Sequence, residues 1–169
     1  MTYFTENDLE RLDYKLLQNG FVTLYFNPQF LAEDVAVLKS LGYLTVEFDS
    51  SIWNSTEDFY DAFADALKFP DYFGRNLDAL SDCLIDVKIP CNGGLVIACS
   101  KFDSFQARFP DFAWEVLDII SEKARRHLLF GKRLICLLQS NNPKISFEIV
   151  GAQPVIWNYR ENLNKNRGL

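Results

Sequence analysis

Apolar residues along this chain occur either in short continuous runs or in stripes with helical spacing. Short, mostly apolar runs predict strands with little exposed surface, and the main ones are found at residues 21–26, 43–48, 95–99 and 133–138. Stripes with a spacing of three or four residues predict helices at residues 6–19, 28–41, 55–68, 76–87 and 110–129. Because strands alternate with helices, the pattern predicts an α/β fold with a small, mostly parallel sheet covered by helices.

The last part of the chain has a different pattern. Residues 145–150 and 154–157 are strand-like runs separated by a glycine, which predicts a β extension at the C-terminal end. The last dozen residues are polar and are predicted to fray. Residues 102–109 are predicted to form a loop. We find no linker and no internal repeat, so residues 1–169 are predicted to form one domain.

Charge is distributed unevenly along the chain. The formal net charge is −6, but residues 49–86 alone contain nine acidic and two basic residues. An acidic surface argues against direct binding of nucleic acid, because phosphate contacts require lysine and arginine. It suits a basic protein partner, although an acidic face kept for solubility explains the charge equally well.

The cysteines and the N-terminus bear on cofactors and on the cell compartment. The four cysteines lack zinc-ligand spacing and the chain has a single histidine, so we expect no metal site and no cofactor. We expect reduced thiols in a cytoplasmic protein, with Cys91 in a loop. The N-terminus is acidic and no apolar run reaches membrane-spanning length, so we expect neither a signal peptide nor a membrane partner.

The segment FPDYFGRNLDALSDCL, residues 69–84, carries the most specific information. An aromatic loop precedes a short helix for which Asn76 is the predicted N-cap. Asp78 and Asp82 are four residues apart, so they share one face of that helix. Two like charges at this spacing cost the helix about 0.2–0.5 kcal/mol. A pair that disfavours the helix indicates a surface prepared for a positively charged partner.

The same segment resembles the barstar family of ribonuclease inhibitors. The family pattern is a proline, an acid, two aromatics, a glycine and one variable residue, followed by Asn-Leu-Asp-Ala-Leu, one residue and Asp-Cys-Leu. Residues 70–84 read PDYFGRNLDALSDCL and match this pattern without a gap. The resemblance covers residues 43–138, so residues 1–42 form an N-terminal helix-strand-helix extension and residues 139–169 a C-terminal one. These extensions are expected to cover opposite edges of the sheet.

The resemblance implies a role for individual residues. Tyr72 matches the loop tyrosine that packs into the active site of the ribonuclease, and Asp78 and Asp82 match the two inhibitory aspartates. A gapless alignment of residues 95–122 places Glu122 on a further acidic contact, whereas an ion pair with Arg125 or Arg126 is the alternative reading. The predicted partner-binding residues are Tyr72, Asn76, Asp78, Asp82, Asp86 and Glu122.

The chain departs from the family pattern around the end of this helix. Ser81 replaces a tryptophan of the best-known member, and Ile85, Asp86 and Val87 replace a Thr-Gly-Trp run, so an aromatic contact is lost. These departures bear on which ribonuclease is recognised.

The resemblance therefore implies a monomeric cytoplasmic protein that inhibits a basic ribonuclease toxin and is not an enzyme. One alternative is a non-inhibitory interaction module on the same fold, because a fold does not determine a function. A second is a hydrolase that holds Mg²⁺ with its acidic side chains. The acidic side chains that would hold the ion are Asp71, Asp78, Asp82, Asp86 and Glu122. Neither a P-loop nor a GxSxG or HExxH motif is present to support it.

Overall fold

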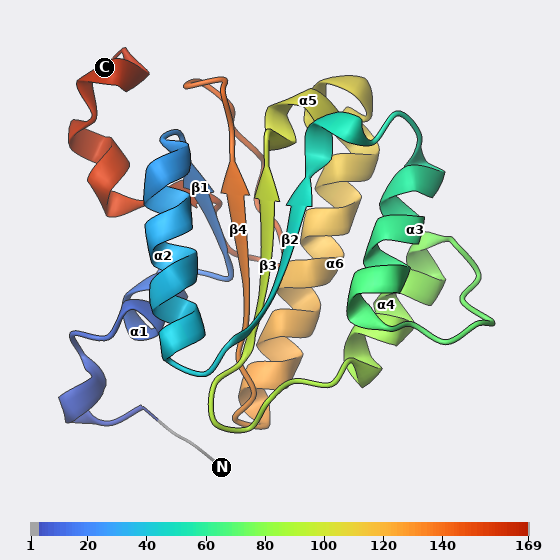
Figure 1. Cartoon of the computed structure of the whole chain (residues 1–169), viewed down its shortest axis with the longest axis horizontal. Coiled ribbons are helices and arrows are strands. Elements are labelled where there is room, and N and C mark those ends of the chain that lie inside the picture. Colours follow the sequence, from blue (N-terminus) through green and yellow to red (C-terminus); the bar gives the residue numbers. More distant parts are fainter. Residues whose placement is uncertain (1–3, 169) are drawn as a thin grey trace.

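The computed structural model describes residues 4–168 and has a five-stranded parallel sheet at its centre (Figure 1). The strand order is β2-β3-β4-β1-β5. The strands are β1 (Val22–Tyr25), β2 (Leu44–Asp49), β3 (Leu95–Ser100), β4 (Leu134–Gln139) and β5 (Ile156–Trp157). The helices are α1 (Leu12–Leu17), α2 (Pro28–Ser40), α3 (Thr56–Leu67), α4 (Leu77–Asp86), α5 (Phe102–Arg108) and α6 (Pro110–Leu129). The predicted α/β fold with a parallel sheet is confirmed.

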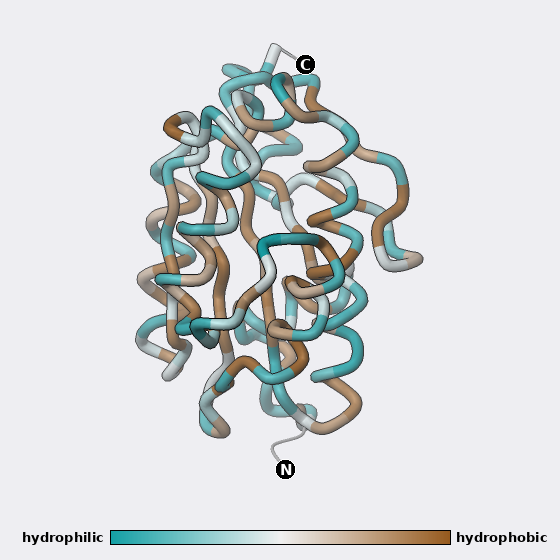
Figure 2. Tube along the Cα trace, turned by 90° about the vertical axis from the view of Figure 1, so that its right-hand side faces the viewer, coloured by the Kyte–Doolittle hydropathy of each residue, from teal (hydrophilic) through white to brown (hydrophobic). Residues whose placement is uncertain are grey.

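Helices cover both faces of the sheet and build a separate core on each. Residues of α3, α4, α5 and α6 pack on one face, and residues of α1 and α2 pack on the other. Neighbouring strand residues point to opposite faces: in β3, Ile97 joins the first core and Ala98 the second. Figure 2 shows the hydrophobic residues along the central strands and hydrophilic residues on outward-facing helical turns.

Both extensions add a strand at the same edge of the sheet, which corrects the expectation that they cover opposite edges. Strand β1 pairs with β4, and β5 pairs with the other side of β1. Strand β2 pairs with β3, and no other described strand pairs with it, so β2 forms the second edge. The sheet formed by residues 43–138 is thus extended at its β4 edge, whereas β2 remains the edge strand at the other end.

Three local predictions are wrong. The stripe at residues 6–19 gives only a short 3-10 helix (Glu6–Asp8) and α1. The predicted loop at residues 102–109 is mostly α5, whose Phe102 and Phe105 are 2% and 0% exposed and fill the core. No regular strand forms at residues 145–150, where Val150 makes one isolated bridge with Gln153.

The polar tail is also more ordered than its composition predicts. Two 3-10 helices, Tyr159–Leu163 and Lys165–Arg167, follow β5. The Glu161 side chain is fully buried and accepts hydrogen bonds from the backbone N–H groups of Phe26 and Asn27 at 2.9 and 2.8 Å. These bonds fasten the tail to the end of β1. Within residues 4–168, no helix combines the length and hydrophobicity that crossing a bilayer requires.

Two cysteine thiols buried in the core lead us to expect a loss of stability at alkaline pH. Burial raises the pKa of the Cys99 thiol from 9.0 to about 12, and it raises the pKa of the Cys136 thiol as well. Between about pH 9 and pH 12 the Cys99 thiol ionises in the unfolded chain but stays neutral in the folded protein. Rising pH in this range therefore favours the unfolded state. The free energy of unfolding should be insensitive to these groups below about pH 9 and fall between about pH 9 and 12.

Urea denaturation at a series of pH values measures this slope. The variant Cys99→Ala removes one such group, so its slope should be shallower by about 1.4 kcal/mol per pH unit. An unchanged slope in the variant would contradict the assignment to Cys99.

Candidate functional site

Helix α4 and the loop that leads into it carry most of the predicted site residues. The Asn76 side chain accepts a hydrogen bond from the Ala79 N–H at 2.8 Å, so the predicted N-cap is confirmed. In the loop, the Phe73 N–H donates to the Pro70 carbonyl at 2.9 Å and closes a tight turn. The start of α4 is therefore fixed by local hydrogen bonds.

The two faces of α4 have opposite character. Leu80 and Leu84 are fully buried in the core and attach the helix to the domain. Asp78, Asp82 and Asp86 follow one another at one-turn spacing and are all exposed. Among the described residues, no hydrogen bond or ion pair engages any of the three carboxylates. A rigid support thus presents three carboxylates whose oxygen atoms are open to a partner.

The two aromatic residues of the loop have different environments. Phe73 contacts Tyr60 and Phe69, with ring centroids 5.8 and 5.0 Å apart, and packs against the core. Tyr72 is 87% exposed. The loop is therefore anchored by one aromatic ring while the next ring projects into solvent.

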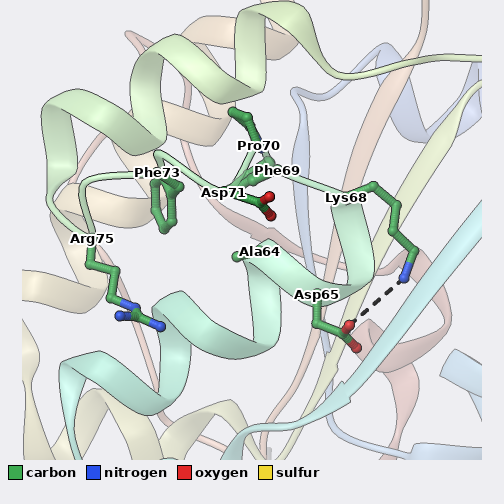
Figure 3. A pocket seen from close by; sticks show the side chains of 8 residues that line it. All are labelled: Ala64, Asp65, Lys68, Phe69, Pro70, Asp71, Phe73 and Arg75. Atoms are coloured by element: carbon green, nitrogen blue, oxygen red, sulfur yellow. Dashed lines mark ion pairs between the residues drawn. The ribbon is translucent and has the colours of Figure 1, made fainter.

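A second attachment holds the loop against α3. Arg75 has a left-handed backbone with φ of 47°, and its Nη2 atom lies 2.6 Å from Oδ1 of Asp61. Figure 3 shows Arg75 and Phe73 beside a cavity of about 430 Å³ between the loop and α3. On its other side, Lys68 and Asp65 form an ion pair at 3.7 Å. The family pattern has a variable residue at position 75, so the sequence did not identify this ion pair.

Glu122 lies on a different helix from the three aspartates. It is exposed on α6, and its Oε1 atom is 3.1 Å from Nζ of Lys123. The alternative pairing with Arg125 or Arg126 is therefore replaced by an ion pair with the adjacent lysine. Val150 of the C-terminal extension lies close by, because the Ser121 hydroxyl donates to the Val150 carbonyl at 3.3 Å.

Helices α4 and α6 are held together by a buried contact. Nε2 of His127 on α6 lies 2.7 Å from the carbonyl oxygen of Leu84 on α4. Burial raises the pKa of the Cys83 thiol on the same helix, and the nearby Asp82 and Asp86 carboxylates raise it further.

Asp82, Asp86 and Tyr72 line one groove, so the structure brings these three predicted residues together. Within residues 4–168, no group of three histidine, cysteine or acidic residues is arranged to hold a metal ion.

Comparison with known proteins places this chain in a family. The family described as Barstar (barnase inhibitor) matches residues 43–139. The protein named "Putative ribonuclease inhibitor YrdF" from Bacillus subtilis (strain 168) is 37% identical over 75 residues, which span 44% of this chain and 78% of that protein. The chain belongs to the barstar family of barnase inhibitors.

Proposed function

We propose that this protein inhibits a basic ribonuclease by inserting the outer face of α4 and the Tyr72 loop into its active site. The observation that carries the proposal is the row of three exposed carboxylates on a helix that is capped and buried on its other side. Ribonuclease active sites bind phosphate through cationic side chains, and carboxylates can accept hydrogen bonds from the same donors. Because α4 is already ordered, little conformational entropy is lost on binding.

The biological role that follows is protection of a cell's own RNA. We propose that the protein acts in the cytoplasm as a monomer and provides immunity to a ribonuclease toxin. Members of its family are inhibitors rather than enzymes, which supports a role without turnover.

A titration of ribonuclease activity tests the proposal. Barnase, and any basic ribonuclease found to be encoded beside this protein, are mixed with increasing amounts of the full chain, and cleavage of a fluorogenic RNA is followed. We expect activity to fall linearly to zero at one inhibitor per enzyme. Full activity of every such ribonuclease at an excess of inhibitor would refute the proposal.

Tyr72 is expected to be an anchor of the complex. Its ring is 87% exposed, so binding would bury a large rigid side chain at small entropic cost. Tyr72→Ala should weaken binding by about 2 kcal/mol, or roughly 30-fold, and leave the free energy of unfolding unchanged. Calorimetric titration and urea denaturation measure the two quantities. Tyr159→Ala is the matched control, because this tyrosine of the C-terminal extension is 63% exposed.

The charge of the site predicts a salt-dependent association rate. The acidic face should attract a basic ribonuclease over distances that salt screens. The association rate constant should fall by about tenfold or more between 0.02 and 0.5 M NaCl, while dissociation changes less. Stopped-flow fluorescence measures both rates. An association rate that does not respond to salt would contradict electrostatic steering.

A further inference from the structure

An apolar groove runs beside the acidic face of α4. Its volume is about 870 Å³, and it lies between the C-terminal end of α3, the Tyr72 loop and the last turn of α4. Its apolar lining includes Leu67, Phe69, Pro70, Cys83, Ile85 and Val87. Leu44, which is 49% exposed on the edge strand β2, continues this lining to the surface.

The charges on the rim of the groove offset one another. Asp82 and Asp86 lie on one side, and Lys68 and Lys88 also line the groove, so its formal net charge is zero. The outer face of α4 carries the same two carboxylates together with Asp78, and it has no basic residue to offset them. A cation from a partner is therefore attracted to the outer face, whereas the groove favours a side chain without charge.

The groove is continuous with the proposed inhibitory site. Tyr72, Asp82 and Asp86 belong to both, so a ribonuclease segment bound at Asp82 lies next to the mouth of the groove. Burying apolar side chains against Ile85 and Val87 would stabilise such a complex by removing apolar surface from water. Buried apolar anchors surrounded by polar contacts are the usual centre of a protein interface.

We propose that this groove receives a large apolar side chain of the ribonuclease, next to the basic residue that Asp82 binds. The inference rests on the proposed inhibitory function and adds a determinant of which ribonuclease is recognised. Ribonucleases without an apolar side chain at that position would still meet the carboxylates of α4 but would leave the groove filled with water. The groove thus selects among basic ribonucleases that the charges alone do not distinguish.

Filling the groove from the inhibitor side tests this assignment. Ala66 is half-buried on α3 and lines the groove, so Ala66→Phe occupies space without changing the charge. We expect its affinity for the ribonuclease to fall by about tenfold or more, through faster dissociation, with an unchanged salt dependence of association. Ala107→Phe is the matched control on an exposed position of α5, and its affinity should stay within about twofold of wild type.

Alkylation of Cys83 tests the same groove without filling it. In a Cys91→Ser background, Cys83 is the accessible thiol, because Cys99 and Cys136 are buried. Complex formation with the ribonuclease should slow the reaction of Cys83 with iodoacetamide by about fivefold or more.

The outcomes separate the two proposals. An inhibitory complex in which Ala66→Phe binds like wild type and Cys83 stays as reactive as in the free protein would overturn the groove assignment and leave the inhibitory function standing. Absence of any complex with a ribonuclease would overturn both. A dimeric free protein with an unreactive Cys83 would assign the groove to a second copy of the chain and overturn this inference.

Discussion

Replacing Asp82 by alanine is expected to weaken inhibition of the ribonuclease by roughly 30- to 4,000-fold, and replacing Asp78 as well should abolish it at micromolar concentrations. Loss of one partner from a desolvated ion pair at an interface costs about 2–5 kcal/mol. This range is the one found for buried interface ion pairs, including those of the barnase–barstar complex. Most of the cost arises because the cationic groups of the ribonuclease would stay buried and unpaired.

The same substitutions should leave the fold almost unchanged. Asp82 is exposed, and its removal relieves repulsion along α4 of about 0.2–0.5 kcal/mol for each like-charge pair. Asp78 lies in the first turn, where a negative charge stabilises the helix by a similar amount. The stability of the double variant should therefore stay within about 1 kcal/mol of wild type.

Inhibition titrations and urea denaturation of the same samples measure both effects. Glu148→Ala is the control, since it changes the net charge equally at an exposed position on the C-terminal segment. Equal loss of inhibition in Glu148→Ala would show that net charge, rather than the geometry of α4, controls binding. Unfolding of the Asp82→Ala variant would contradict the placement of this carboxylate on a free surface.

The parts of the fold that sequence reasoning predicted are those with strong local signals. The first five residues of β4 are all apolar, and α2 begins with an asparagine cap followed by proline. Asn76, the cap of α4, accepts the predicted hydrogen bond. The burial of Leu80 follows from the helical spacing of the apolar residues in the motif, whereas the exposure of Tyr72 was implied only by the resemblance to the barstar family.

Features that depend on distant segments escaped prediction. Helix α5 has no side-chain cap. The residue before it, Lys101, has a left-handed conformation, and the Gln139 side chain accepts a hydrogen bond from the Lys101 N–H at 2.8 Å. Its Phe102 and Phe105 are buried against residues from other elements of the core. The groove beside α4 combines residues of β2, α3 and α4, so no local pattern indicated it.

A buried polar network explains why the C-terminal tail is ordered. Asp34 on α2 is 6% exposed, and its Oδ1 accepts a hydrogen bond from Arg160 Nη2 at 2.5 Å. Its Oδ2 accepts from the Tyr25 hydroxyl at 2.7 Å and from the Asn158 amide at 3.1 Å. These partners come from α2, β1 and the tail, and thus connect the N-terminal and C-terminal extensions. Composition alone made the tail look disordered because it does not reveal such pairing.

Asp34→Ala is therefore expected to lower the free energy of unfolding by about 3–5 kcal/mol and the Tm by about 6–20 °C. The substitution would leave the Arg160 guanidinium without its buried carboxylate, and the fully buried Tyr25 hydroxyl without its acceptor. Thermal denaturation followed by circular dichroism measures the shift.

Glu33→Ala is the matched control for this substitution, because Glu33 binds the same Arg160 at 2.7 Å from an exposed position. Its loss should cost no more than about 1 kcal/mol, since exposed ion pairs contribute little. Equal destabilisation by the two variants would show that burial of Asp34 does not determine its contribution.

Figure 1 places α2 and the tail across the sheet from α4, so folded Asp34→Ala should still inhibit the ribonuclease at one-to-one stoichiometry. Retained inhibition would assign the two extensions to stability, whereas lost inhibition by the folded variant would give them a part in binding.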